Sequence, residues 1–281
     1  IVCASILLLM LLAMIFAPLI APHDPYQGSM IRRLRGIGTP NYILGTDELG
    51  RDMLTRLLFG GRLSWFMGIT PVALAFAIGT FFGVLAGYAG GKTNMAIMRV
   101  TDVFYAFPSV LLAVAISGAL GQQLPWVLQV ILPDVVKSRF DPALLNAIMA
   151  LTLVFIPPVI RVAESVTQGV RNLDFVDAAR ASGASAFTIV RVHVLGNVLG
   201  PIFIYATSLI SVCMILASGL SFLGLGTRPP EPEWGLMLNT LRTAIYVQPW
   251  VAVLPGICIF VTSICFNLVS DGLRQAMDVK G

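Results

Sequence analysis

The amino-acid sequence predicts an all-α polytopic membrane protein with about six transmembrane helices. Of its 281 residues, 57% are hydrophobic and only 11% are charged, whereas charged residues make up about 25% of a typical soluble domain. Six apolar segments have roughly the 20-residue length that a helix needs to cross a bilayer. We expect them to be helical, because backbone groups in lipid can pair only with one another. The segments are residues 1–20, 63–88, 97–119, 144–163, 198–220 and 250–269.

The first apolar segment precedes a long polar stretch at residues 21–62. It lacks a convincing signal-peptide cleavage site, so we interpret it as a retained span. From Asp52 onward, an amphipathic helix is expected to lie at the lipid headgroups and to lead into the second span. We therefore divide the chain into residues 1–62, a first membrane helix with a long external or interfacial segment, and residues 63–281, a core of five spans.

Three glycines recur every four residues in the second span, at Gly79, Gly83 and Gly87. This interval places them on one face of a helix, and small residues spaced in this way allow membrane helices to approach closely. We expect a helix-packing face there. The competing interpretation is that these glycines only make the helix more flexible.

The link after the second span, Ala86 to Thr93, is a near match to a phosphate-binding loop. However, Ala86 stands where that motif requires glycine, and the link joins two membrane spans instead of a strand and a helix. We therefore expect this chain to bind no nucleotide and no other cofactor. The four cysteines lie in apolar segments without the spacing of a metal site, so no metal is expected either.

Few charged residues fall within the expected spans. Arg99 and Asp102 are three residues apart near the start of the third span and are expected to pair with each other. Pro108 follows and can kink that helix. The fourth span is expected to end at Arg161 and Glu164, so that no charged side chain lies in the middle of a span.

Charged and small residues interrupt the apolar sequence between the fourth and fifth spans, at residues 171–197. We expect a short helix at 173–182, because Gly183 is the residue type that usually follows a helix end. A second helix is expected to restart at 184–185 and to continue toward the fifth span. A projection of this kind at a membrane face is suited to docking a partner.

This loop resembles the EAA loop of the membrane subunits of bacterial ABC importers, in which Glu-Ala-Ala precedes a glycine by three residues. Here Asp177-Ala178-Ala179 precedes Gly183 at that spacing, with aspartate in place of glutamate, and Gly196 stands where proline is common. Three further stretches resemble the C-type permeases of dipeptide and oligopeptide importers. They are LGTDELGRDMLTRLLFGGRLS at 44–64, SFLGLG with a later Glu-Trp-Gly at 221–235, and NLVSDGLR at 267–274.

The resemblance implies an ABC type I importer-like fold, with a cytoplasmic coupling-helix loop, in the bacterial cytoplasmic (inner) membrane. It implies a non-catalytic permease that forms half of a translocation pathway for peptides or related small solutes. The implied partners are a second homologous permease, two ABC ATPase subunits that use ATP and Mg²⁺, and an extracytoplasmic substrate-binding protein; nucleic acid is not implied. The residues implied to contact the ATPase are Leu173, Asp174, Phe175, Asp177, Ala178, Ala179, Arg180 and Gly183.

An ion-coupled secondary transporter is the alternative. Such a protein would need ionisable residues near mid-bilayer or paired broken helices, and the expected spans contain neither. An intramembrane protease is a weaker rival, because the only histidines, His23 and His193, lie in expected loops. Trp234 is expected at the membrane interface, as tryptophan often is.

The charge distribution leaves the orientation in the membrane open. Eight of the 18 lysines and arginines lie on the side of the 171–197 loop and the other ten lie opposite, so the positive-inside rule favours neither side. Only the resemblance places the loop in the cytoplasm. The resemblance also leaves the substrate open among dipeptides, longer peptides, glutathione and nickel complexes.

Overall fold

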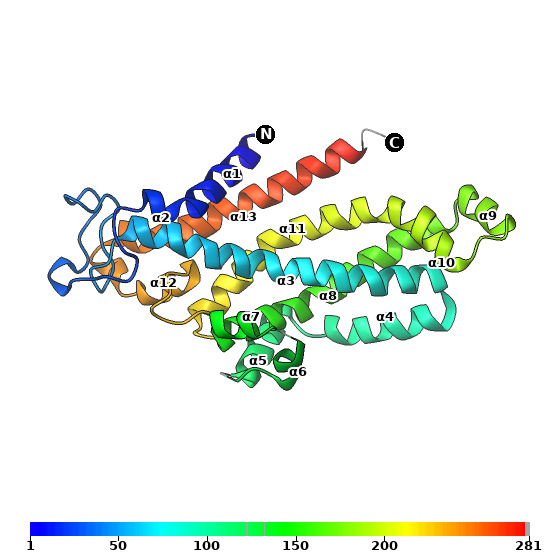
Figure 1. Cartoon of the computed structure of the whole chain (residues 1–281), viewed down its shortest axis with the longest axis horizontal. Coiled ribbons are helices and arrows are strands. Elements are labelled where there is room, and N and C mark those ends of the chain that lie inside the picture. The colour runs from blue at the N-terminus through cyan, green and yellow to red at the C-terminus, as the bar shows by residue number, and fades with distance from the viewer. Residues whose placement is uncertain (122, 132, 279–281) are drawn as a thin grey trace.

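The computed structural model describes residues 1–121, 123–131 and 133–278, and every regular element in these ranges is a helix. The helices form an elongated bundle (Figure 1). In chain order they are α1 (Val2–Ile15), α2 (Ala17–Ile20), η1 (Met30–Arg32), α3 (Met53–Ala89), α4 (Gly91–Tyr105), α5 (Ser109–Leu120), α6 (Trp126–Ile131), α7 (Asp134–Arg139), α8 (Pro142–Arg171), α9 (Asp174–Ala181), α10 (Ala186–Thr188), η2 (Ile189–Val194), α11 (Leu195–Phe222), α12 (Trp234–Thr240), η3 (Ala244–Tyr246) and α13 (Pro249–Asp278).

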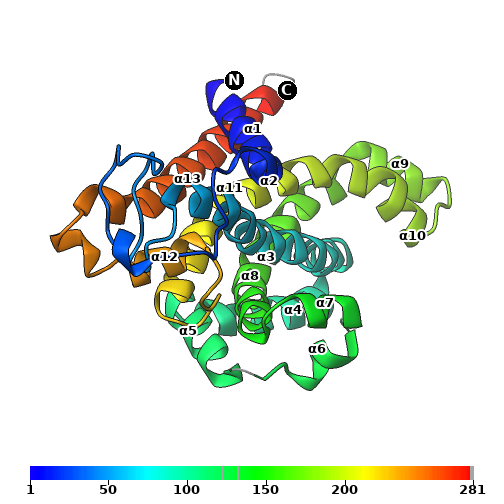
Figure 2. The ribbon, with the colours of Figure 1, turned by 60° about the vertical axis from the view of Figure 1, so that its left-hand side comes forward.

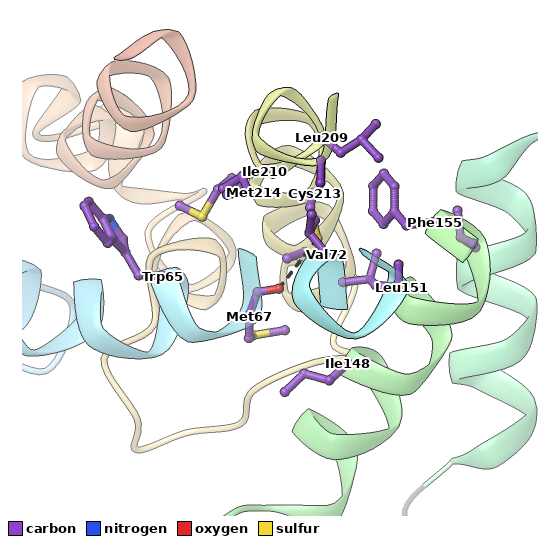
Figure 3. Packing of buried hydrophobic residues seen from close by; sticks show 14 of the residues in the cluster. Trp65, Met67, Val72, Ile148, Leu151, Phe155, Leu209, Ile210, Cys213 and Met214 are labelled. Carbon is purple, nitrogen blue, oxygen red and sulfur yellow. Dashed lines mark hydrogen bonds between the residues drawn. The ribbon is translucent and has the colours of Figure 1, made fainter. Parts of the chain in front are cut away.

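The centre of the bundle is the contact of α3 with α8, and α11 packs against both. Figure 3 shows this core, in which Val72 of α3 lies near Leu151 of α8 and Cys213 of α11. All three side chains are almost completely buried. Because lipid tails are as apolar as these side chains, close van der Waals packing is what holds membrane helices together.

Four helical stretches are long and apolar enough to cross a membrane: α3, α8, the run from Ala186 to Phe222, and α13. The pair α4 and α5 makes a fifth candidate span, bent by 86°. The first expected segment forms α1 and α2, which are separated at Phe16, and α1 has only 14 residues. The all-helical membrane fold is therefore confirmed, with two of the six expected segments interrupted.

The break between α4 and α5 has a local cause in Pro108. Proline has no N–H to donate and disfavours helical backbone at the preceding residue, here Phe107. The chain leaves the helix at Ala106 and restarts at Ser109, with Pro108 as the N-cap of α5. The expected kink is in fact an almost perpendicular turn.

Two other helices are longer than expected. α3 runs for 37 residues from its N-cap Asp52, whose carboxylate accepts the Thr55 N–H at 2.8 Å. The expected surface helix and second span are thus one helix, and α3 crosses the 62/63 boundary without interruption. α8 continues to Arg171, so Arg161 and Glu164 lie inside it and not at its end.

Functional features lie at the two ends of the bundle (Figures 1 and 2). One end carries α9 and α10, the 171–197 loop. The opposite end carries the polar segment 21–52 together with α12, and we call residues 21–52 and 226–248 the cap. The N-terminal helix α1 packs along α13.

Candidate functional site

The 171–197 loop is held in one conformation by its backbone. After α9, the Gly183 N–H donates to Arg180 O and the Ala184 N–H to Ala179 O, both at 3.1 Å, which is the hydrogen-bond pattern of a Schellman motif. Gly183 has φ of +81°, a conformation that favours glycine. Ser185 then caps α10 by accepting the Thr188 N–H at 3.2 Å.

A π-helical segment, η2, connects α10 to the membrane helix α11. Its Ile189 and Val194 are buried, as is Val176 of α9, so these three side chains attach the loop to the bundle. Phe175 lies 6.2 Å from the His193 ring, measured between ring centroids. The sequence predicts the continuing helix but not its π-helical geometry, which is often found at functional positions.

The side chains that do not anchor the loop face outward. Asp177 and Arg180 form an ion pair at 2.7 Å, and both remain more than half exposed. Ala178 and Gly183 are exposed, whereas Ala179 is partly buried. The loop also exposes four large apolar side chains: Leu173, Phe175, Phe187 and Val192. Leu173, Asp174 and Phe175 are among the residues expected to contact a partner, whereas the sequence analysis did not single out Phe187 or Val192.

The three glycines of α3 lie directly against α8. A Cβ at position 79 would lie 2.7 Å from the Val159 side chain, and one at position 83 would lie 2.6 Å from the carbonyl oxygen of Ile160. At position 87 it would lie 2.7 Å from Glu164 O. Larger side chains would therefore force α3 away from the helix that leads into the loop.

An ion pair connects α4 to α8, and both of its side chains are about half exposed. Arg161 Nη2 lies 2.6 Å from Asp102 Oδ1, and the Arg161 guanidinium lies over the Tyr105 ring at 4.3 Å. The expected pairing of Arg99 with Asp102 is therefore wrong. Arg161 lies ten residues before the last residue of α8 (161 to 171), or about 15 Å along the helix, so these charges lie deeper than expected.

The cap contains a buried cluster of charges within the LGTDELGRD stretch. Asp47 Oδ2 lies 2.7 Å from Arg51 Nε and 3.2 Å from Arg56 Nε, and all three side chains are almost fully buried. Asp47 Oδ1 accepts the N–H groups of Leu49 and Arg51, each at 2.9 Å. Arg56 also donates to the carbonyl oxygens of Pro25 and Pro230. The cluster thus holds both cap segments to the start of α3.

A second buried group joins the cap to α3 near Gly60 and Gly61. Glu233 accepts the N–H groups of Gly235 and Leu236 and the Ser64 hydroxyl at 2.8 to 2.9 Å. Burial raises the pKa of its carboxyl group, although these donors oppose the shift. Trp234 is buried and donates from Nε1 to Leu57 O at 3.0 Å, so its expected place at the membrane interface is wrong.

The glycine pair on α3 makes this contact possible. A Cβ at Gly60 would overlap the carbonyl oxygen of Pro232, and one at Gly61 would lie 2.7 Å from the Trp234 ring. In the sequence, the feature that corresponds to this contact is Gly60-Gly61 together with the distant Glu233-Trp234-Gly235. Neither stretch alone indicates the contact.

Solved structures share this fold. The chain superimposes on a chain of the inward-facing MetNI methionine ABC transporter with a TM-score of 0.56 at 21% identity, covering 79% of this chain and 97% of that one. A crystal structure of an amino acid ABC transporter with histidines gives a TM-score of 0.56 at 12% identity, covering 79% and 94%. At these identities the likeness shows the fold.

Sequence comparisons extend over nearly the whole chain. It is 37% identical over 280 residues to the di/tripeptide transport system permease protein DppC of Pseudomonas aeruginosa, covering 98% of this chain and 86% of the relative. It is 36% identical to the glutathione transport system permease protein GsiD of Pectobacterium atrosepticum, covering 99% and 86%. It is also 36% identical to the probable D,D-dipeptide transport system permease protein DdpC of Escherichia coli, with the same coverage.

Two family descriptions match separate parts of the chain. Residues 1–35 match the N-terminal TM domain of oligopeptide transport permease C. Residues 79–279 match the binding-protein-dependent transport system inner membrane component. These matches favour an ABC permease over an ion-coupled secondary transporter. The chain belongs to the binding-protein-dependent transport system inner membrane component family, as a multi-pass permease subunit of an ABC importer in the inner membrane.

Proposed function

We propose that this permease forms half of a translocation pathway and couples it to separate ATPase subunits through the 171–197 loop. The partners in this proposal are a second homologous permease, two ABC ATPases that use ATP and Mg²⁺, and an extracytoplasmic substrate-binding protein. The loop then faces the cytoplasm and the cap faces outward. The chain itself binds no nucleotide in this proposal.

The exposed apolar surface of the loop carries the proposal. Leu173, Phe175, Phe187 and Val192 expose large apolar side chains on a loop that is attached to the bundle through other residues. The last turns of α8 before the loop carry Glu164, Gln168 and Arg171, so lipid is not expected to cover this surface. Several large exposed apolar side chains gathered on one short loop are typical of a protein contact site.

The charged pair on the loop supplies polarity beside this apolar surface. The Asp177 carboxylate can accept charge-assisted hydrogen bonds from a basic partner, and the exposed Ala178 next to it leaves room for close approach. Because the loop continues into α8 and α11 without a flexible linker, a rigid-body movement of an ATPase would be passed on to both membrane helices.

The test is a charge placed within the apolar surface. We expect Phe187→Asp to abolish co-purification of the ATPase subunits and ATP-driven uptake in proteoliposomes, while membrane insertion stays normal. Val247→Asp is the matched control, because Val247 is also an exposed apolar residue but lies at the opposite end. Normal ATPase association in Phe187→Asp would contradict the docking role of this surface.

We further infer that the transported solutes are small peptides. The support is that the relatives named above are described as di/tripeptide, D,D-dipeptide and glutathione transport permeases. Uptake of labelled peptides by the complete transporter, with its binding protein and ATP, tests the inference. Uptake of a non-peptide solute that an excess of peptide does not inhibit would overturn it.

A further inference from the structure

A cavity of about 580 Å³ opens in the cap beside the start of α3. It lies between α3, the first residues of α8 and the segment 227–232. Its size is within the range of small-molecule sites. One part of its wall is aromatic, formed by Phe59 and Phe66 of α3 and Phe140 before α8, and the rings of Phe66 and Phe140 stack with centroids 5.0 Å apart.

The cavity also carries a positive group that nothing else uses. Arg228 lines it and, within the described part of the chain, has no acidic partner. The other arginine in the wall is committed elsewhere: Arg62 donates to the carbonyl oxygens of Met14 and Ile15 at 2.7 and 3.0 Å and lies over the Phe59 ring. Arg228 is therefore the group that could bind a carboxylate.

Two carboxylates line the same cavity, and each has spare acceptor capacity. Asp141 accepts the Ala143 N–H at 2.7 Å through one oxygen. Glu231 accepts the Tyr26 hydroxyl at 3.1 Å through Oε2, and burial followed by the Glu231 charge raises the pKa of that phenol, so it remains a donor. Neither carboxylate pairs with a cation among the described residues. Their remaining oxygens could accept from an ammonium group.

We propose that this cavity binds a small zwitterionic peptide, with its carboxylate at Arg228, its ammonium group at Glu231 or Asp141, and its side chains against the aromatic wall. The inference rests on the proposed peptide import and adds a site in this subunit at which the solute is held after release from the binding protein. The charged groups of the cavity would recognise the two ends of the peptide backbone, which all such peptides share. The apolar wall would accept side chains of different kinds.

The test measures binding without transport. The complete transporter is purified through a tag on this chain, placed in lipid nanodiscs without binding protein, and titrated with labelled L-alanyl-L-phenylalanine. We expect Arg228→Gln to weaken binding at least tenfold, and Arg242→Gln, an exposed arginine outside the cavity, to leave it unchanged. The C-amidated dipeptide should bind the wild type and Arg228→Gln equally weakly. Glu231→Gln or Asp141→Asn, according to which carboxylate binds the ammonium group, should remove the preference for a free over an acetylated amino group.

Several outcomes would overturn the site. The first is that Arg228→Gln binds the dipeptide with wild-type affinity. The second is that Arg228→Gln weakens binding of the amidated dipeptide as much as it weakens binding of the free dipeptide. The third is that the wild type shows no saturable binding. Weaker association of the ligand-free binding protein with Arg228→Gln would instead show that Arg228 contacts that protein. Uptake assays separate the two proposals, because peptide uptake without binding at the cavity overturns only this site, whereas absence of peptide uptake overturns the proposed cargo.

Discussion

The cap and the 171–197 loop use charge in opposite ways. In the cap, Asp47, Arg51 and Arg56 are buried, and both arginines form ion pairs with Asp47. In the loop, Asp177 and Arg180 are exposed and pair with each other. Both ends expose large apolar side chains, among them Phe187 in the loop and Val247 in the cap. The comparison teaches that charged side chains are buried and paired within the chain at one end of the molecule, whereas at the other end they stay at the surface.

The largest effect on stability is expected from a substitution that breaks the charge cluster of the cap. Asp47→Asn would leave two buried arginines with less negative charge between them, and losing one partner of a buried ion pair costs about 3–5 kcal/mol. We expect a large fall in thermal stability in detergent. Arg33→Ala, at an exposed arginine of the same segment, should change it little, and equal effects would contradict the importance of the cluster.

The next effect concerns the glycine seam that joins the two ends. Gly83→Leu would collide with backbone of α8 at Ile160, and overpacking of this kind costs about 1–3 kcal/mol or more. We expect a lower yield of assembled transporter by size-exclusion chromatography. Gly169→Leu is the matched control, because nothing lies near a Cβ at that position of α8. Normal assembly of Gly83→Leu would mean that the seam is not a critical contact.

A smaller effect on stability is expected at Glu233, where burial makes the free energy of unfolding depend on pH. Because burial raises its pKa, the folded protein binds this proton more tightly than the unfolded chain. The free energy of unfolding should therefore fall as pH rises from the ordinary carboxyl pKa to the raised one. Glu233→Gln should remove this slope and cost about 1–2 kcal/mol, since one hydrogen bond to the backbone is lost. Thermal unfolding between pH 4 and 8 measures both, and an unchanged slope would exclude Glu233 as its source.

The smallest effect on stability is expected in the loop. An exposed pair such as Asp177–Arg180 contributes about 0.2–1 kcal/mol, so Asp177→Lys should be expressed and inserted normally. If the proposed docking holds, this variant should nevertheless lose ATPase association and transport, because like charge would face a basic partner. Wild-type transport would remove Asp177 from the interface. A stability loss as large as that of Asp47→Asn would erase the contrast between the two ends.

Local sequence signals predicted the elements well, because their causes are local. The lengths of the apolar segments predicted most of the membrane helices, and Gly183 predicted the end of α9. The contacts between distant segments were not predictable in this way. Asp102 pairs with Arg161 and not with Arg99, since the partner lies on another helix, and Trp234 is buried because Gly60 and Gly61 leave space for it.

The surface of the loop was predicted only in part for a related reason. The sequence predicted that a second helix leads from Ser185 toward the fifth span, but it did not identify Phe187 and Val192 as surface residues. The π-helical turn changes the angular position of the residues on either side of it. A pattern that assumes 3.6 residues per turn cannot follow that change.

The π-helix η2 also has a consequence for how the loop is aimed. A π-turn holds one more residue than an α-turn, so deleting a single residue within 189–194 would return the segment to an α-helix. Each residue corresponds to about 100° of rotation around the helix axis. The loop would then turn by about that angle relative to α11 while its own fold remained intact. The extra residue therefore sets the direction that Phe187 and Asp177 face relative to α11.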